Sequence, residues 1–258
     1  MRSLALGRGL RLGFILAATL LANAAAFADE IKVLSAGAYK AVLMGEIPAF
    51  EKQTGHKVNV TGDTAGGLMK RIKGGEAFDL VVLTGAAVDE LLRSGDLASG
   101  SAVPLAKVGI GVAVLKGAPM PDISTEAAFR QAVVSARAVA MVDPGAGGTS
   151  GIYLVRLYER WGIAAQVMPK AVLVPGGYSA DKLVSGEADL AVQQMSELVA
   201  VSGAQVVGYL PAAVQSYTVY TGAIGARAAK RGAAMQLLDA LHSPAVRPAL
   251  EQRGMTAP

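Results

Sequence analysis

Apolar and polar positions along the chain follow two kinds of pattern. Residues 31–35 and 79–84 are short runs that are largely apolar, whereas Leu68 and Ile72 stand four apart, as on one face of a helix. A nearly continuous apolar run such as 79–84 is typical of a strand that is covered on both faces. The repeated order of strand and helix predicts a parallel sheet with right-handed crossovers.

The same alternation continues to the end of the chain. We expect strands at 31–35, 56–61, 79–84, 108–115, 138–142, 171–174 and 188–193, and extended segments at 206–210 and 216–224. We expect helices at 40–54, 66–73, 87–94, from 124, at 154–161, 179–185 and 226–241, and a last helical segment at 243–253.

These elements predict an α/β protein of two lobes, each a mostly parallel sheet flanked by helices. The first lobe would hold residues 29–108 and 208–258, and the second lobe would hold 109–207. Two crossings, near 107–111 and 204–209, would form a hinge. Ligands of such folds lie beyond the carboxyl ends of the strands, which places a site between the lobes.

The first 28 residues have the composition of a secretory signal. A basic start is followed by an apolar run at 12–21 and by Ala26-Phe27-Ala28, and we expect cleavage after Ala28. A retained N-terminal anchor is the alternative, although the apolar run is short for a membrane span. The sequence therefore predicts a periplasmic protein that is not inserted in the membrane after cleavage.

Removal of this segment changes the charge of the chain. The whole sequence has 24 Lys and Arg against 20 Asp and Glu, and three of the arginines lie in the predicted signal, so the mature chain is nearly neutral. Nucleic-acid binding has no electrostatic support.

Residue types that commonly bind metal ions or act in nucleophilic catalysis are scarce in this chain. The chain has no cysteine, and its two histidines, His56 and His242, stand far apart in sequence. Thiolate and histidine metal sites are therefore disfavoured, and no Gly-x-Ser-x-Gly motif indicates a serine hydrolase. We predict no metal and no cofactor.

Residues 143–153, Asp-Pro-Gly-Ala-Gly-Gly-Thr-Ser-Gly-Ile-Tyr, are the strongest candidate for a binding site. A glycine-rich turn that ends in hydroxyl residues at a helix start offers free N–H groups to an anion. The Lys-Ser/Thr ending of a nucleotide-binding phosphate loop is missing. A strand-to-helix turn without a ligand is the alternative.

Four segments carry a family resemblance that covers nearly the whole mature chain. Residues 31–38, 62–84, 143–153 and 184–191 resemble the molybdate-type periplasmic solute-binding proteins of ABC transporters. The segment 62–84 is the most specific, with a hydroxyl turn, a helix, and Gly-x-x-x-Asp leading into a buried strand. The resemblance implies a class II binding fold whose lobes close on an oxyanion by a hinge.

At the ligand positions of that family the chain departs from the pattern. The family's first hydroxyl falls on Ser35, and its serine pair falls on Thr64 and Ala65, so that one hydroxyl is lost. A tetrahedral oxyanion needs most of its hydrogen bonds. The departures therefore favour a di- or tricarboxylate over a compact oxyanion.

Further candidates come from the other strand ends. Gln193 and Gln194 stand where the family has a tyrosine, and they offer amide donors and acceptors or simply close a strand end. Arg71 either binds a ligand carboxylate through two hydrogen bonds or belongs, together with Lys70, to a solvent-exposed helix face. The complete predicted binding set is Ser35, Gly37, Thr64, Ala65, Arg71, Thr84, Gly148, Thr149, Ser150, Tyr153, Gln193 and Gln194.

Two functions remain open on this reasoning. One is a receptor that delivers a small anion to an ABC permease of the inner membrane. The other is an enzyme, because bacterial aconitate isomerase is similar to this family and would move a proton allylically between trans- and cis-aconitate. The acid or base would then be Tyr39, Lys40, Asp63 or Glu197, among which the sequence does not choose.

Overall fold

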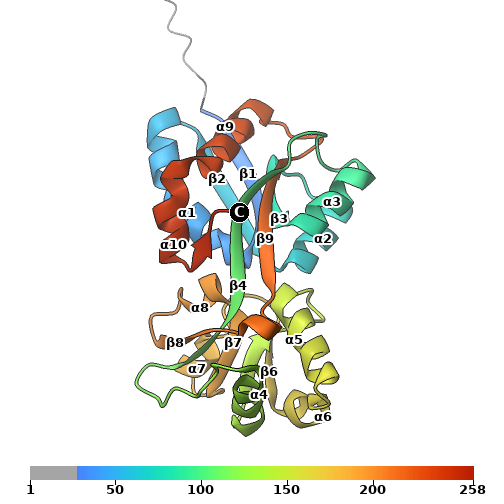
Figure 1. The fold of residues 1–258 in the computed structure, drawn as a ribbon. Coiled ribbons are helices and arrows are strands. Elements are labelled where there is room, and N and C mark those ends of the chain that lie inside the picture. The colour runs from blue at the N-terminus through green and yellow to red at the C-terminus, as the bar shows by residue number, and fades with distance from the viewer. Residues whose placement is uncertain (1–27) are drawn as a thin grey trace, which may run out of the picture.

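Two α/β lobes joined by two chain crossings make up the molecule (Figure 1). The computed structural model describes residues 28–258, so the predicted signal segment lies, apart from Ala28, outside the described residues. The predicted two-lobed α/β fold is confirmed. None of the helices in the described part of the chain is both long and apolar enough to cross a membrane.

The first lobe is built on the sheet order β2-β1-β3-β9-β4. The strands β1 (Glu30–Ala36), β2 (Lys57–Asp63) and β3 (Leu80–Thr84) are parallel, and β9 (Tyr217–Ile224) runs antiparallel to β3. Helices cover both faces of this sheet (Figure 1). They are α1 (Gly37–Thr54), α2 (Ala65–Lys73), α3 (Gly85–Ser94), α9 (Arg231–His242), the short η3 (Pro244–Val246) and α10 (Arg247–Gln252). The two-residue strand β10 (Met255–Thr256) pairs with β4.

The second lobe repeats this plan with shorter strands. The parallel strands β5 (Val139–Val142), β6 (Ala171–Val174) and β7 (Leu190–Gln194) form its centre, and β8 (Ala204–Tyr209) pairs antiparallel with β4. Its helices are α4 (Glu126–Ser135), α5 (Thr149–Arg160), α6 (Ala164–Val167), α7 (Asp181–Val184), α8 (Met195–Leu198), and the short η1 (Met168–Lys170) and η2 (Ala212–Val214).

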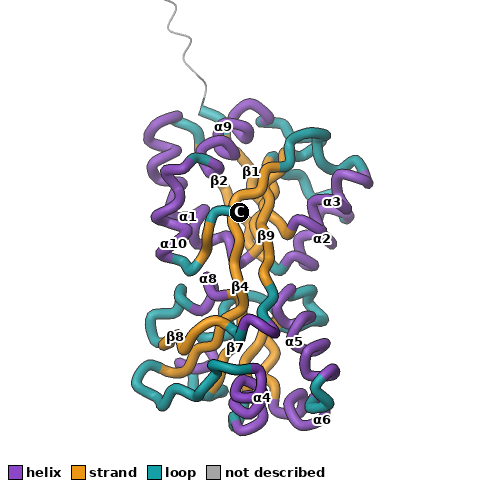
Figure 2. The backbone as a smooth tube through the Cα atoms, in the orientation of Figure 1, coloured by secondary structure: helices purple, strands orange, loops and turns teal. Residues whose placement is uncertain are grey.

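One long strand, β4 (Val103–Leu115), belongs to both lobes. Its first half pairs with β9, and its second half pairs with β7 and β8 (Figure 2). The chain returns to the first lobe at residues 215–217, later than the predicted 204–209, because Leu210 and Val214 are still buried in the second core. Gln215 ties the two crossings together, since its amide both accepts from the Ile110 N–H at 2.9 Å and donates to the Ile110 carbonyl at 3.0 Å.

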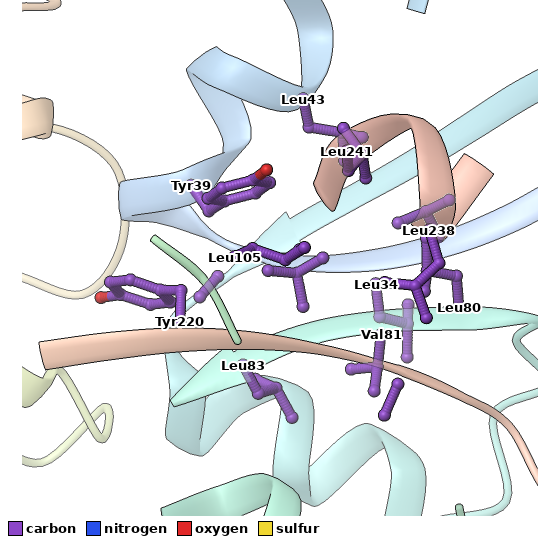
Figure 3. Close-up of a cluster of buried hydrophobic side chains, with 14 of the residues drawn as sticks. Leu34, Tyr39, Leu43, Leu80, Val81, Leu83, Leu105, Tyr220, Leu238 and Leu241 are labelled. Carbon is purple, nitrogen blue, oxygen red and sulfur yellow. The ribbon is translucent and has the colours of Figure 1, made fainter. Parts of the chain in front are cut away.

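Each lobe has its own apolar core. The first core is rich in leucine and extends from β1 and β3 to α9, as Figure 3 shows for Leu34, Leu80 and Leu238. Tyr39 lies among these residues, whereas the hydroxyl of Tyr220 points away from the leucines. The second core gathers residues from the strands and from α4 and α5. The cleft between the lobes therefore lies between two separate cores.

The largest differences between the predicted and observed helix starts are at α5 and α9. The helix α5 begins at Thr149 rather than at 154, because Gly151 fits closely under the preceding strand, where a Cβ atom would lie 2.0 Å from the Val142 carbonyl oxygen. The helix α9 begins at Arg231 rather than at 226, because the preceding residues bind elsewhere: the Lys230 N–H donates to Asp79 Oδ1 at 2.9 Å.

Candidate functional site

A cleft of about 310 Å³ lies between the lobes, at the carboxyl ends of their parallel strands. Both lobes supply its walls, from the starts of α1, α2 and α5 and from the segment around α8. The residues that line it are Ala36, Gly37, Ala38, Lys40, Gly62, Asp63, Thr64, Ala65, Val142, Gly148, Thr149, Ser150, Gly176, Gly177, Tyr178, Gln194, Glu197 and Tyr220.

The N-termini of three helices, α1, α2 and α5, meet at this cleft. The first N–H groups of a helix have no intrahelical partner and carry the positive end of the helix dipole. No side chain caps α1 or α5, whereas the hydroxyl of Thr64 caps α2 by accepting from the Gly67 N–H at 2.9 Å. The starts of α1 and α5 are therefore open to an anion.

The glycine turn before α5 forms much of the second-lobe wall. Gly147 has φ +76°, a conformation that favours glycine, and Gly148 packs so closely on Val142 that a Cβ atom would lie 2.4 Å from it. Ser150 is 1% exposed, and its hydroxyl has no hydrogen-bond partner among residues 28–258. An unpaired buried hydroxyl beside open helix N–H groups fits a ligand that accepts hydrogen bonds.

The lobes also touch each other directly beside the cleft. The Gly66 N–H donates to the Gly147 carbonyl at 3.2 Å, and the Thr64 hydroxyl donates to the Ala146 carbonyl. A Cβ atom on Gly66 would lie 2.7 Å from the Gly147 Cα, so no larger residue fits this contact. The hydroxyl of Thr64 is thus used to join the lobes and to cap α2.

Glu197 is a buried acidic residue that lines the cleft. It is 9% exposed, and its Oε1 lies over the start of α1, where a Cβ atom on Gly37 would come within 2.7 Å of it. Burial raises the pKa of Glu197 from 4.5 to about 8, against a smaller opposite effect of a hydrogen bond with Gln193. Glu197 therefore exchanges its proton near neutral pH.

Two tyrosines lie close enough to Glu197 to sense its charge. Burial and then the charge of Glu197 raise the pKa of Tyr220, and the same two causes, in that order, raise the pKa of Tyr178. Both phenols line the cleft and stay protonated near neutral pH, so they are donors to a ligand rather than bases.

Gln194 and Asp63 differ in whether their side-chain oxygen atoms already have hydrogen-bond partners among the described residues. Gln194 donates from Nε2 to the Thr218 hydroxyl at 3.0 Å, while its buried Oε1 has no partner. Asp63 is fully engaged: Oδ1 accepts from the Thr64 N–H at 2.7 Å, and Oδ2 lies 3.3 Å from the Arg71 Nε. Asp63 is therefore poorly placed to act as a base.

Ten of the residues predicted from the sequence line the cleft. They are Gly37, Lys40, Asp63, Thr64, Ala65, Gly148, Thr149, Ser150, Gln194 and Glu197.

The other six predicted residues lie outside the lining. Ser35 is fully buried and donates to the Ala36 carbonyl, and Tyr39 lies inside the first core (Figure 3). Thr84 caps α3, where its hydroxyl accepts from the Ala87 N–H. The hydroxyls of Ser35 and Thr84 are thus used within the protein, whereas Tyr39 is removed from the cleft by its place in the core.

Arg71, Tyr153 and Gln193 are also held by the protein. Arg71 binds Glu76 as well as Asp63 on an exposed helix face, and the Tyr153 hydroxyl donates to the Val214 carbonyl at 2.7 Å. The Gln193 amide binds the loop between β6 and α7.

Tyr178 and Tyr220 line the cleft but were not predicted. Pro175-Gly-Gly-Tyr178 follows β6 directly, so the rule that places ligands at strand ends, applied to this turn, would have found Tyr178. Tyr220 lies within β9, and nothing in its surrounding sequence marks it. Among residues 28–258, no group of three His, Asp or Glu side chains is placed to hold a metal ion.

The comparisons with known proteins agree with this geometry. Residues 31–256 match the family model described as bacterial extracellular solute-binding protein. The chain belongs to this family. A curated relative that is 36% identical over 252 residues, covering 95% of each chain, is the aconitate isomerase of a Pseudomonas species.

Solved structures of solute-binding proteins share the fold. The periplasmic molybdate-binding protein of Azotobacter vinelandii superimposes with a TM-score of 0.73 at 19% identity, over 88% of this chain and 99% of that one. The sulfate-binding protein SubI of Mycobacterium tuberculosis gives a TM-score of 0.70 at 16% identity, over 89% and 87% of the two chains. At these identities the likeness establishes the fold only.

Proposed function

We propose that this solute-binding protein is an aconitate isomerase that interconverts trans- and cis-aconitate in the cleft between its lobes. The observation that carries the proposal is Glu197, a buried carboxyl in an anion site, with a pKa of about 8. An ionised carboxylate in the cleft repels an anionic ligand, so a group such as Glu197 brings no advantage to a receptor. An isomerase, in contrast, needs a group in the cleft that takes and returns a proton near neutral pH.

The cleft offers the other parts that the reaction needs. The open N-termini of α1 and α5, together with Ser150 and Lys40, are the donors for the substrate carboxylates. The same donors stabilise the charge that spreads onto a carboxylate when a carbon next to it loses a proton. The cleft volume of about 310 Å³ is at the lower end of the range for small-molecule sites, which suits a six-carbon acid.

The reaction consists of two proton transfers. Ionised Glu197 removes a proton from the methylene carbon of aconitate, and the electron pair of that C–H bond forms a new double bond to the central carbon. The original double bond shifts its electrons onto the outer carbon, which then receives the proton that Glu197 has taken up, so that atoms and charge balance and Glu197 is again ionised.

Incubation of the purified mature protein with trans-aconitate tests the proposal. Proton NMR should show cis-aconitate appear, and the Glu197→Gln variant should bind the substrate without converting it. Absence of turnover by the natural sequence, together with an unchanged melting temperature in either aconitate, would falsify the proposal.

A receptor for an ABC permease is the second candidate. The direct contact of Gly66 with Gly147 favours it, because a closing interface between lobes suits a protein that traps a ligand for delivery. Thermal stabilisation by a carboxylate, molybdate or tungstate without any turnover supports the receptor and excludes the isomerase. The periplasmic location, which both candidates share, rests on the signal-like segment at residues 1–28.

A further inference from the structure

The short helix α8, which carries Glu197, is anchored in both lobes. It follows β7 of the second lobe directly and packs against α1 of the first lobe, at the boundary between the lobes (Figure 1). Its last residue, Leu198, is fully buried in an alanine-rich cluster of the second lobe, whereas its first residue, Met195, is 4% exposed and belongs to the first core. Glu197 thus lies on a single helical turn whose two ends are buried in different lobes.

The side chain of Met195 fills a slot between two glycines. A Cβ atom on Gly111 of β4 would lie 2.6 Å from the Met195 Cε, and a Cβ atom on Gly254 would lie 2.5 Å from the Met195 Cγ. The Gly254 carbonyl accepts from the hydroxyl of Tyr209 in β8 at 2.7 Å, which holds this wall of the slot in place. The unbranched methionine side chain suits such a narrow space, and larger residues at either glycine would exclude it.

Met195 and Glu197 are linked through the same turn of α8. The Val199 N–H closes this turn by donating to the Met195 carbonyl at 3.0 Å. The Glu197 Oε1 lies over the start of α1, within 2.7 Å of the place that a Cβ atom on Gly37 would take. A displacement of α8 would therefore carry the carboxyl away from the start of α1, and a misplacement of about 1 Å at a reacting group can lower turnover about 10²-fold.

We propose that Met195 is a positioning residue for Glu197: seated between Gly111 and Gly254, it holds α8 against the first lobe and keeps the carboxyl over the start of α1. The inference rests on the proposed function. Met195 is not among the described residues that line the cleft, and Glu197 remains the group that exchanges the proton.

Three variants separate a positioning role from the general stability of the first core. Met195→Ala empties the slot, and Met195→Leu fills it again with nearly the same volume. Leu241→Ala is the matched control, because it opens a cavity in the same core (Figure 3) on α9, a helix that supplies none of the described lining residues of the cleft.

The first measurement is the turnover of trans-aconitate at about pH 9.5, where Glu197, with a pKa of about 8, is ionised. Met195→Ala should lower kcat about tenfold or more and change KM less than about twofold, because the donors to the substrate carboxylates stay in place. Met195→Leu should restore kcat, and Leu241→Ala should lower the melting temperature without lowering kcat. An equal kcat in Met195→Ala and Leu241→Ala overturns the inference.

The second measurement is the titration of Glu197 by carbon-detected NMR of glutamate-labelled protein, with Glu197→Gln to assign the signal. Release of α8 exposes the carboxyl to water, so the midpoint should fall by about one pH unit or more in Met195→Ala and stay in place in Met195→Leu and Leu241→Ala. The other titratable groups that line the cleft are Lys40 of α1, Asp63 of β2, Tyr178 and Tyr220, and Arg253 follows α10 next to the slot. These groups are the same in all three variants, and an unmoved midpoint in Met195→Ala overturns the inference.

A second pair of variants keeps the test decisive if Met195→Ala does not fold. Gly254 has φ +64° and Gly162 has φ +67°, so alanine strains the backbone alike at both positions, but only at Gly254 does the added Cβ atom meet Met195. Gly254→Ala should lower kcat and the Glu197 midpoint in the same directions as Met195→Ala, and Gly162→Ala should change neither. Equal effects of these two variants overturn the inference.

Failure of the proposed function is distinguishable from failure of this inference. If the natural sequence does not convert trans-aconitate, the proposed function fails, while the Glu197 titration still decides whether Met195 holds the carboxyl. If the natural sequence converts trans-aconitate and Met195→Ala behaves like Leu241→Ala, the inference fails and the proposed function stands.

Discussion

The two walls of the cleft use their polar groups differently. On the first-lobe wall, Asp63 is bound to Arg71, and the Thr64 hydroxyl joins the Ala146 carbonyl across the gap. On the wall formed by second-lobe segments, the Ser150 hydroxyl and the Gln194 Oε1 have no partner, and Glu197 is buried without a paired cation. The polar groups of the first-lobe wall are therefore bound within the lobe or across to the other lobe, whereas Ser150, Gln194 and Glu197 keep hydrogen-bonding capacity for a ligand in the cleft.

This difference explains why the two walls of an apparently symmetric site have unequal roles. The first lobe presents the N-termini of α1 and α2 and the second lobe that of α5, and of these α2 is capped by Thr64 whereas α1 and α5 have no side-chain cap. A capped terminus has already given up one of its free donors, so it attracts an anion less than an open one. We therefore expect substitutions on the second-lobe wall to affect chemistry and binding, and those at Thr64 and Gly66 on the first-lobe wall to affect closure.

The largest effect is expected at Glu197. Glu197→Gln removes the group that takes and returns the proton, and general acid–base catalysis contributes about 10²–10⁴-fold. Turnover of trans-aconitate should fall by that factor while its dissociation constant, measured by calorimetry, changes little. Equal activity of the variant would place the chemistry on another group of the cleft.

The pH dependence follows from the raised pKa of Glu197. The base must be ionised, so kcat/KM should increase with pH and level off above a pKa of about 8. The folded state holds this proton more tightly than the unfolded state, in which the pKa is near 4.5, so Glu197 makes folding less favourable as pH rises between these values. A rate profile with its lower limb near 4.5 would contradict the assignment.

A smaller effect is expected at Ser150. Ser150→Ala removes one donor to a charged ligand, which should weaken binding about tenfold or more. Tyr158→Phe is the matched control, because it removes a buried hydroxyl that also lacks a partner but does not line the cleft. Calorimetry with trans-aconitate compares the two, and equal losses would remove Ser150 from the site.

Gly66→Ala should act on closure rather than on chemistry. The added Cβ atom meets the Gly147 Cα and forces the lobes apart, so the ligand should dissociate faster and its affinity should fall about tenfold. Stopped-flow release and the radius of gyration of the ligand-bound protein measure this. Gly45→Ala in α1, where a Cβ atom meets nothing, is the control, and a loss of affinity there would mean that the effect is unspecific.

The smallest effect is expected at Arg71. Its guanidinium binds Asp63 and Glu76 on a half-exposed face, and exposed ion pairs contribute about 0–1 kcal/mol. Arg71→Ala should therefore change the dissociation constant of trans-aconitate by less than about twofold. A large loss would show that the first-lobe wall contributes a cation to the ligand.

Much of the fold could be predicted from local sequence patterns, but only part of the candidate site could. The buried strand β3 and the helix α2 have periodicities that packing preserves, and the strand-end rule placed Ser150 and Gln194 at the cleft. Ser35 was predicted on the same rule, and Arg71 as a bidentate carboxylate ligand, but both are bound by their own neighbours, the Ala36 carbonyl and Glu76. Which partner satisfies a polar side chain depends on residues brought near by tertiary packing.

The role of Glu197, too, could not be predicted from the sequence alone. The sequence offered it as one of four acids or bases without a way to choose among them. Its raised pKa depends on burial against α1 and on the missing side chain of Gly37, far away in the chain. Tyr220, in the middle of β9, enters the cleft only because that strand crosses between the lobes.

The strand β4 has a consequence for how the molecule unfolds. Because one half of it pairs in the first-lobe sheet and the other half continues directly into the second-lobe sheet, unfolding of one lobe frays the strand on which the other sheet depends. The two cores, though separate in space, should therefore melt together in a single cooperative transition. A ligand bound between them then stabilises the whole chain at once, and calorimetry records its affinity as a shift of one melting temperature.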